Sequence, residues 1–277
     1  MDHNQKKLSG PTNQSLVWFI TGCSSGFGNL FVPAILARGD KVIATARNAS
    51  SLDEFKDSDN VRILQLDVTA SPDELAAKAA DAVDLFGRVD VLVNNAGYVL
   101  SGVWEEVSHD QVLDQMQTNL FGQMNVARAF LPHMRKRRAG TMVFMGSIAG
   151  WLGVAAGGPY SASKFALEGA VESLEKEVSP LGIRVHLMVL GQFQRQAETS
   201  GKQPGDPEKA VQRILDVVRR EGSVAPEEEL PLRIVLGSDA VQVIRTKCLE
   251  TLKLLEDYGQ LACSTDFPGA RSVQDYK

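Results

Sequence analysis

Two side chains near the middle of the sequence have the types and spacing needed to reduce a carbonyl group. Tyr160 and Lys164 are four residues apart in a segment of helical pattern, so both lie on one face of a helix. A ketone that accepts hydride at carbon needs a proton at oxygen, and a tyrosine hydroxyl (unperturbed pKa ~10) can give it when a nearby cation lowers that pKa. A tyrosine and a lysine with this spacing also occur by chance on many helices, so the pair needs support from other residues.

Two further polar residues supply that support. Ser147 follows the apolar run 141–145, and its hydroxyl can hold a substrate oxygen beside Tyr160. Asn119 lies in the long helical segment before that run, where its amide can anchor a water that relays protons to Lys164. The alternative for Asn119 is a buried amide that bonds the backbone of its own helix.

A glycine-rich turn joins the first apolar run, 16–20, to a helical stretch that ends near Arg38. Gly22, Gly26 and Gly28 allow a tight turn, and the helix N-terminus behind them offers free N–H groups to a diphosphate. The spacing differs from GxGxxG, and the Lys-Ser/Thr of a P-loop is absent. An ordinary tight turn is therefore the alternative.

The end of the second apolar run bears on the choice of cofactor. Many dinucleotide folds place Asp or Glu there for the ribose hydroxyls, whereas this chain has Arg47 and no acid until Asp53. A guanidinium suits a 2′-phosphate, so NADP(H) is favoured over NAD. Asp67 ends the third run, where its carboxylate can accept from the adenine amino group beside the Val68 backbone. The alternative is an aspartate that orders the following turn.

Strand-like and helical segments alternate along the chain. Apolar runs predict strands at 16–20, 41–45, 61–66, 89–93, 141–145, 183–189 and 231–236, and helical spacing predicts helices from 29 to 38, 71 to 86, 108 to 138, 159 to 179 and 238 to 258. This alternation predicts a single-domain, doubly wound (Rossmann-like) α/β fold, with a parallel sheet and helices on both faces. The glycine loop, Arg47, Asp67 and Ser147 all follow strands, at the edge where such sheets bind ligands.

The domain organisation follows from the same pattern. Residues 1–15 are expected to form a flexible tail, 16–260 the domain, and 261–277 a second tail. The pattern fades between 191 and 222, which predicts a substrate loop or lid. Pro33 is expected to kink the first helix or to remove one of its hydrogen bonds.

Composition excludes several other classes of protein. The chain has 277 residues, 44% hydrophobic and 23% charged, with a formal net charge of −5, which does not favour nucleic-acid binding. The three cysteines and four histidines show neither a disulfide framework nor a metal-ligand spacing. No apolar run approaches the ~20 residues of a membrane span, and the polar N-terminus does not resemble a secretory signal. A cytoplasmic location is therefore expected.

Taken together, the motifs resemble the short-chain dehydrogenase/reductase family over about residues 16–190. Residues 21–28 (TGCSSGFG) resemble its TGxxxGxG loop, residues 94–97 its NNAG motif, and Asn119, Ser147, Tyr160 and Lys164 its four catalytic positions. The resemblance implies NADP(H) as cofactor, with Arg47 at the basic position of the NADP-preferring members. The implied cofactor contacts are Gly22, Ser24, Ser25, Gly26, Phe27, Gly28, Arg47, Asp67, Val68, Asn94, Ala96, Gly97, Tyr160 and Lys164.

The glycine loop and the Ala-Thr-Ala-Arg segment are most similar to hydroxysteroid- and retinol-dehydrogenase-like enzymes and to fungal ketoreductases. The chain departs from the family after 190, where Leu190-Gly191-Gln192 replaces the usual Pro-Gly and the next threonine is Thr199. Four residues are candidates for an apolar pocket wall, with simple packing as the alternative: Trp104, Trp151, Leu152 and Phe193. Cys23, beside a helix N-terminus, is a candidate for an acidified, redox-sensitive thiol or a small residue that merely fits there.

The expected activity is reduction of a carbonyl to an alcohol, or the reverse, on a small apolar or polycyclic, polyketide-like substrate of specialised metabolism. Two alternatives remain open: a non-redox nucleotide-binding protein, and an isomerase or epimerase that retains the cofactor. The resemblance also allows a homodimer or homotetramer, through helices near 108–138 and 159–179.

Overall fold

Seven strands form one parallel sheet in the computed structural model, which describes residues 14–193, 203–225 and 228–267. The strands are β1 (Val17–Ile20), β2 (Lys41–Ala46), β3 (Val61–Gln65), β4 (Val91–Asn94), β5 (Gly140–Met145), β6 (Ile183–Leu190) and β7 (Arg233–Leu236). Their order across the sheet is β3-β2-β1-β4-β5-β6-β7, so the order reverses between β1 and β4. The predicted doubly wound sheet is confirmed, and the ligand-binding crevice of such sheets lies at that reversal.

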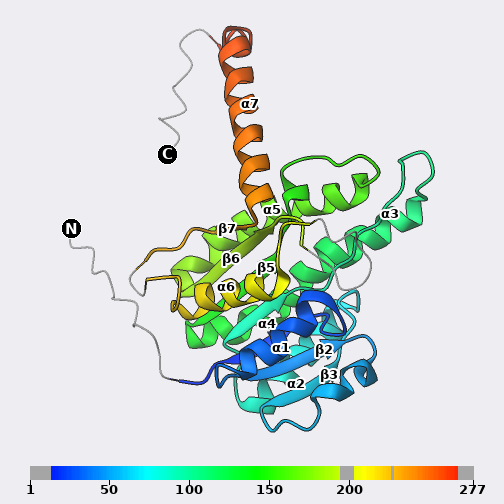
Figure 1. The fold of residues 1–277 in the computed structure, drawn as a ribbon, viewed down its shortest axis with the longest axis vertical. Coiled ribbons are helices and arrows are strands. Elements are labelled where there is room, and N and C mark those ends of the chain that lie inside the picture. Colours follow the sequence, from blue (N-terminus) through cyan, green and yellow to red (C-terminus); the bar gives the residue numbers. More distant parts are fainter. Residues whose placement is uncertain (1–13, 194–202, 226–227, 268–277) are drawn as a thin grey trace.

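Helices cover both faces of the sheet (Figure 1). One face carries α1 (Gly26–Leu36) and α6 (Pro207–Arg219), and the other carries α2 (Pro72–Phe86), α4 (Gln123–Arg137) and α5 (Gly158–Val178). Short helical turns complete the connections: η1 (Ala49–Phe55), α3 (His109–Met116), the π-helical η2 (Gln117–Gly122), η3 (Ile148–Gly150) and η4 (Ser179–Leu181). The segment expected as one long helix from 108 to 138 is therefore α3, η2 and α4 in series.

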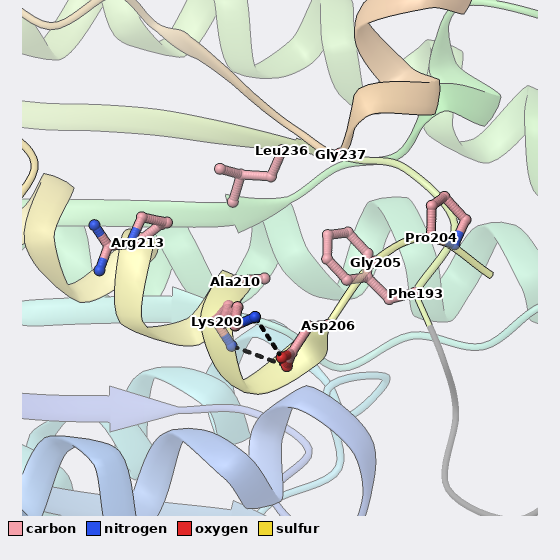
Figure 2. A pocket seen from close by; sticks show the side chains of 9 residues that line it. All are labelled: Phe193, Pro204, Gly205, Asp206, Lys209, Ala210, Arg213, Leu236 and Gly237. Carbon is pink, nitrogen blue, oxygen red and sulfur yellow. Dashed lines mark hydrogen bonds and ion pairs between the residues drawn. The ribbon is translucent and has the colours of Figure 1, made fainter. Parts of the chain in front are cut away.

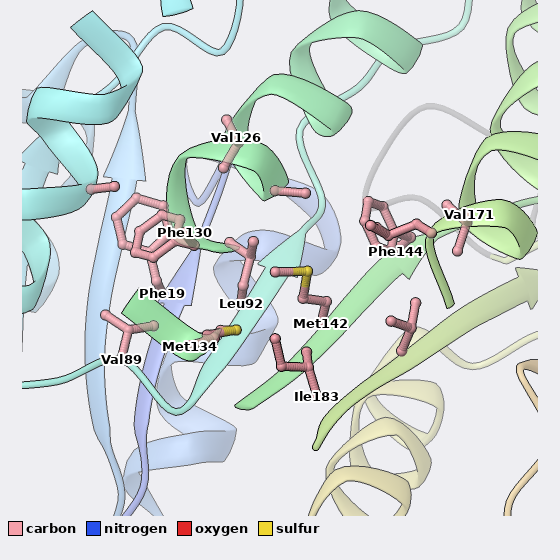
Figure 3. Packing of buried hydrophobic residues seen from close by; sticks show 14 of the residues in the cluster. Phe19, Val89, Leu92, Val126, Phe130, Met134, Met142, Phe144, Val171 and Ile183 are labelled. Atoms are coloured by element: carbon pink, nitrogen blue, oxygen red, sulfur yellow. The ribbon is translucent and has the colours of Figure 1, made fainter. Parts of the chain in front are cut away.

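The core has two layers because side chains alternate across each strand. Phe19 of β1 points to the α4 side, where its ring centroid lies 4.6 Å from that of Phe130, and Figure 3 shows this pair beside Leu92 and Met134. Trp18 points the other way and packs in the cluster that contains Phe31 of α1. Each such fully buried side chain stabilises the fold by roughly 1.5–3 kcal/mol.

The segment from 191 to 222, expected to be a loop, contains a helix. Asp206 caps the N-terminus of α6 by accepting from the Glu208 and Lys209 N–H groups, and Pro207 occupies its first turn. The helix ends with Arg219, whose guanidinium contacts the buried carboxylate of Asp40 at 2.7 Å. The loop prediction is wrong for 207–219, because a cap, a buried face and an ion pair fix a helix there, while 194–202 lies outside the described residues.

The last helix departs most from expectation. α7 (Ser238–Cys263) runs five residues past its predicted end at 258, projects away from the body (Figure 1) and buries only Ala240. Most residues expected as terminal tails, 1–13 and 268–277, lie outside the described part of the chain. Within the described ranges, none of the helices is both long and apolar enough to cross a membrane.

Pro33 lies within α1 as expected. The helix continues around it to Leu36, and Pro33 supplies no N–H to the preceding turn. The proline therefore removes one hydrogen bond without ending the helix.

Candidate active site

The glycine loop is fixed to the neighbouring strand by a small network of hydrogen bonds. Thr21 is fully buried, and its hydroxyl accepts from the backbone N–H groups of Asn95 and Ala96, both at 2.9 Å. The Asn95 amide donates back to the carbonyls of Thr21 and Gly22 at 2.8 and 3.1 Å. Thr21 and Asn95 thus join the ends of β1 and β4, which sets the shape of the crevice at the reversal of strand order.

The loop and the start of α1 fit a diphosphate group. Ser25 caps α1 without a side-chain hydrogen bond, and no acidic residue lies in the first turn, so the positive end of the helix is unshielded. A Cβ at Gly26 would meet nothing within 4 Å, whereas one at Gly28 would lie 2.1 Å from the Gly22 carbonyl oxygen. The loop therefore folds tightly on its inner side and stays open on its outer side, where Ser24 and Ser25 are exposed.

The residues expected to select the cofactor lie on the same edge of the sheet. Arg47 directly follows β2, is exposed, and forms no ion pair with a carboxylate in the described ranges. Asp67 is also exposed, but its Oδ1 accepts from the backbone N–H and the hydroxyl of Thr69 at 2.9 and 2.8 Å. Asp67 therefore has the turn-ordering role that was its alternative, and its adenine contact stays a prediction beside the buried Val68.

The NNAG segment divides into a buried and an accessible part. Asn94 is 0% exposed, and neither atom of its side-chain amide has a hydrogen-bond partner among the described residues. Its side chain offers no surface to a cofactor, so the expected contact is wrong for that side chain. Ala96 is half-buried and Gly97 exposed, which leaves their backbone as the part of the motif that can reach a ligand.

Tyr160, Lys164 and Ser147 lie around the end of β5. The Lys164 ammonium donates to the carbonyl of Met145, the last residue of β5, at 2.6 Å and lies 5.8 Å from the centroid of the Tyr160 ring. Ser147 follows two residues later and accepts from the Ala149 N–H at 3.1 Å. Burial lowers the pKa of Lys164 to about 8, against the opposing charge of Glu168. The structure thus places a buried lysine near the Tyr160 ring and at the end of the strand that Ser147 follows.

Asn119 lies in the π-helical turn η2, a type of turn that is frequent at functional sites. Its Nδ2 donates to the Tyr98 carbonyl at 2.9 Å and to the Ser163 hydroxyl at 3.4 Å, while its Oδ1 accepts from the Tyr98 N–H at 3.0 Å. Ser163 in turn donates to the Tyr160 carbonyl at 2.7 Å. The Asn119 side chain therefore does not bond the backbone of its own helix. Its amide instead links the segment after β4 to α5.

A pocket of about 270 Å³ lies beside this edge, where β6 and β7 end (Figure 2). Phe193 lines it, and the Phe193 ring packs edge-on against Phe27 of the glycine loop with centroids 5.4 Å apart. The remaining lining residues are Pro204, Gly205, Asp206, Lys209, Ala210, Arg213, Leu236 and Gly237. The pocket thus lies between the segment after Leu190, where the sequence departs from the family pattern, and the glycine loop. Tyr160 does not line it.

The other candidates for an apolar wall differ in position. Trp104 is 63% exposed, and its ring lies against Gly158 at the start of α5, close to Tyr160. Trp151 instead packs on the core and under the guanidinium of Arg233, 6.0 Å from its ring, so it has the packing role that was its alternative. Leu152 is half-buried.

Cys23 is not an acidified thiol. It is 0% exposed, its Sγ donates to the Ile20 carbonyl, and burial raises the pKa of the thiol to about 12. Burial raises the pKa of this thiol by more than the nearby helix N-terminus can lower it, so the interpretation of Cys23 as a small residue that fits there holds.

Several residues of the site were not found by sequence reasoning. The Met145 carbonyl, Ser163 and Tyr98 contribute contacts that depend on approach of distant segments. Asn95 was named only within its motif, although a polar residue directly after a strand beside a glycine loop is a signal that could have identified it. No group of three or more His, Cys, Asp or Glu with metal-binding geometry occurs in the described ranges.

Comparison with known proteins agrees with this architecture. The family model described as short chain dehydrogenase matches residues 16–204. A 3-ketodihydrosphingosine reductase of Bacteroides thetaiotaomicron is 41% identical over 65% of each chain, and the oxidoreductase calM of Penicillium decumbens is 33% identical over 88% of this chain and 91% of the relative.

Solved structures show the same relationship. A short-chain dehydrogenase from Streptomyces avermitilis has a TM-score of 0.82 and 34% identity, covering 92% of this chain and all of that one. A short chain dehydrogenase from Burkholderia cenocepacia, solved in complex with NADP, shares the fold with a TM-score of 0.75 and 24% identity, covering 88% of this chain and 97% of that one. The match of the family model over more than half of the sequence, together with these relatives, shows that the chain belongs to the short-chain dehydrogenase family.

Proposed function

We propose that this protein is an NADP(H)-dependent reductase that converts a carbonyl group of a small apolar substrate to an alcohol. The observation that carries the proposal is the buried Lys164 ammonium, which lies on the same helix face as Tyr160 and 5.8 Å from its ring. A family relative named for a keto substrate and a neighbour solved with NADP support the same reaction class.

The cofactor supplies a hydride when it is bound. The open loop from Gly22 to Gly28 and the start of α1, whose N-cap makes no side-chain hydrogen bond, would hold its diphosphate, and the exposed Arg47 would pair with a 2′-phosphate. Asp67, the Val68 backbone, and the backbone of Ala96 and Gly97 complete the site toward the adenine and the ribose.

The catalytic residues of the proposed reaction move and hold one proton. Tyr160 gives its hydroxyl proton to the substrate oxygen, and Ser147 donates a hydrogen bond to that same oxygen. Lys164 stabilises the phenolate that forms because its positive charge lies close to the ring. Asn119 has a positioning role rather than a relay role, because its amide already bonds Tyr98 and Ser163.

The substrate class follows from the surroundings of Tyr160. The exposed apolar side chains near the start of α5 are Tyr98, Val99, Val103, Trp104 and Val154, and the exposed residues next to Trp104 in the sequence include Ser101, Glu105 and Glu106. The apolar side chains offer contact area to an apolar or polycyclic carbonyl compound, and the two carboxylates disfavour an acidic substrate.

The test is consumption of NADPH, and separately of NADH, with ketones, aldehydes and quinones of increasing apolar area. We expect NADPH to be used in preference to NADH, and Tyr160→Phe to abolish turnover while NADPH still binds. Full turnover in Tyr160→Phe would overturn the assignment of the proton donor. Binding of NADPH without consumption by the wild type would favour the non-redox or isomerase alternatives.

A further inference from the structure

A second charged residue lies on the buried face of α5, one turn after Lys164. Glu168 is four residues further along the helix, and residues with this spacing lie on the same face. Lys164 is 6% exposed and Glu168 is 7% exposed. A carboxylate so withdrawn from water is costly unless it is paired. The residues that pair with Glu168 therefore indicate its role.

The partner of Glu168 comes from the far end of the sequence. Arg233 of β7 contacts the Glu168 Oε2 through Nε at 2.6 Å and the Glu172 Oε2 through Nη2 at 2.6 Å. Glu172 is one turn further along α5 and has a 42% exposed side chain. The charges on α5 and β7 thus alternate in sign from Lys164 to Glu168, Arg233 and Glu172.

The turn that carries Ser147 closes over this row of charges. A Cβ at Gly150 would lie 3.0 Å from Glu168 Cγ and 3.1 Å from the Lys164 carbonyl oxygen, so the turn and the helix are in direct contact. The next residue, Trp151, packs on Arg233. The Trp151 Nε1 and Glu168 Oε1 are both buried without a hydrogen bond of normal geometry, although the indole N–H is close enough to lower the pKa of the carboxyl.

We propose that Glu168 is a positioning residue for the carbonyl reduction proposed above: its carboxylate, kept ionised by Arg233, holds Lys164 as an ammonium beside Tyr160. The inference rests on that proposed function for its link to catalysis. Its physical core is the placement of a buried carboxylate one helical turn from the buried Lys164 ammonium, which does not depend on the substrate.

The electrostatic directions agree with this arrangement. Burial lowers the pKa of Lys164, and the negative charge of Glu168 raises it again. Burial raises the pKa of Glu168 above its ordinary value, Arg233 offsets part of that rise, and Glu172 adds to it. The charged groups that face Glu168 are therefore Lys164 and Glu172 on its own helix and Arg233 on β7, and the turn after β5 presents the Trp151 indole. Removal of the Glu168 charge leaves burial unopposed, so Lys164 loses its proton at lower pH.

The experiment is a pH titration of Lys164 by NMR in full-length protein labelled with ¹³C at the lysine side chains, with the signal assigned by its loss in Lys164→Arg. In Glu168→Gln we expect the pKa of Lys164 to fall by about one unit, the lower range for loss of an opposite charge nearby. The matched control is Glu172→Gln, which removes a carboxylate from the same arginine one turn away and is expected to leave the Lys164 titration unchanged. Glu168→Asp keeps the charge and is expected to restore most of the wild-type value.

A second readout links the coupling to the reaction. In Glu168→Gln the loss of NADPH-dependent activity at high pH should begin at lower pH than in the wild type, because the ammonium is lost earlier. If Glu168→Gln does not fold, Glu168→Met fills the same space without a charge and carries the same prediction.

An unchanged Lys164 titration in a folded Glu168 variant overturns the inference, whatever the activity. A lowered Lys164 pKa in a protein that reduces no carbonyl supports the coupling and overturns the proposed function instead.

Discussion

Two long helices of this protein, α5 and α7, relate to the core in opposite ways. α5 has 21 residues, of which nine are buried, and it carries Tyr160, Lys164 and Glu168. α7 has 26 residues, of which one is buried, and it projects from the body (Figure 1). Helix length is therefore a poor guide to how firmly a helix is held, and the proposed chemistry lies on the one whose side chains are packed.

The forces that hold the two helices differ accordingly. α5 is held by apolar contacts such as those of Leu167 and Val171, which are 0% exposed, and by the Glu168–Arg233 ion pair. α7 exposes Leu252, Leu255 and Tyr258, and its helical form rests on local pairs such as Lys253–Asp257. Packing fixes rotamers, so a proton donor on α5 can be aimed, while α7 has no such constraint along its outer turns.

The largest expected effect is a matched pair of leucine truncations. Leu167→Ala on α5 should lower the free energy of unfolding by about 2–5 kcal/mol, because it opens a cavity in the core. Leu255→Ala on α7 should change it by less than about 0.5 kcal/mol, since that side chain is 60% exposed. Urea unfolding followed by circular dichroism measures both. A large fall in the free energy of unfolding in Leu255→Ala would show that α7 is packed in solution and would contradict the difference between α5 and α7.

A pH effect of intermediate size is expected in β6, on the face of the sheet opposite to α5. Burial lowers the pKa of His186 on β6 to about 4, from 6.5 in the unfolded chain. The unfolded state therefore takes up the proton first, so the stability contributed by the neutral imidazole is present above pH 6.5 and is lost as the pH falls toward 4. Between pH 7 and pH 5 this one group should cost on the order of 2 kcal/mol of stability.

The measurement compares wild type with His186→Gln by urea unfolding at both pH values. Other groups contribute equally to both proteins, so the smaller pH dependence of the variant isolates the histidine. If the free energy of unfolding changed equally with pH in the two proteins, His186 would have the same pKa in the folded and unfolded states.

The smallest expected effect is on α7. Asp257→Asn removes an exposed ion pair between residues four apart, Lys253 Nζ to Asp257 Oδ2 at 2.8 Å. Such pairs contribute about 0.3–0.5 kcal/mol, and salt weakens them further. Helix content by circular dichroism at low and high salt should differ slightly in the wild type and not in the variant. If Asp257→Asn lowered the free energy of unfolding by more than about 1 kcal/mol, the pair would belong to a larger network of charges.

Much of the fold could be predicted because parallel strands leave a strong pattern. The apolar runs and the residues that follow them identified the sheet and the edge at which Ser147, Tyr160 and Lys164 meet. Helix α6 was missed because the glycine- and proline-rich residues before it obscured the Asp206-Pro207 start, which is itself an N-cap signal. The π-turn at Asn119 leaves no clear trace in sequence, since it adds only one residue to a helical turn.

Contacts between distant segments could not be predicted. Glu168 and Arg233 are 65 residues apart, and only the placement of β7 beside β6 brings them together. The burial that overturned the reactive-thiol interpretation of Cys23 is likewise a property of the packed molecule. Types and spacing of residues indicate a site, whereas its electrostatics depend on tertiary structure.

The most direct test of the central claim is transfer of deuterium from NADPH labelled at its hydride-donating carbon. The wild type is incubated with the ketone that it consumes fastest, and the alcohol is analysed by mass spectrometry beside Tyr160→Phe. We expect the wild type to give an alcohol that carries one deuterium on carbon, and the variant to give none. An unlabelled alcohol, or equal labelled product from Tyr160→Phe, would contradict reduction by hydride transfer with Tyr160 as proton donor.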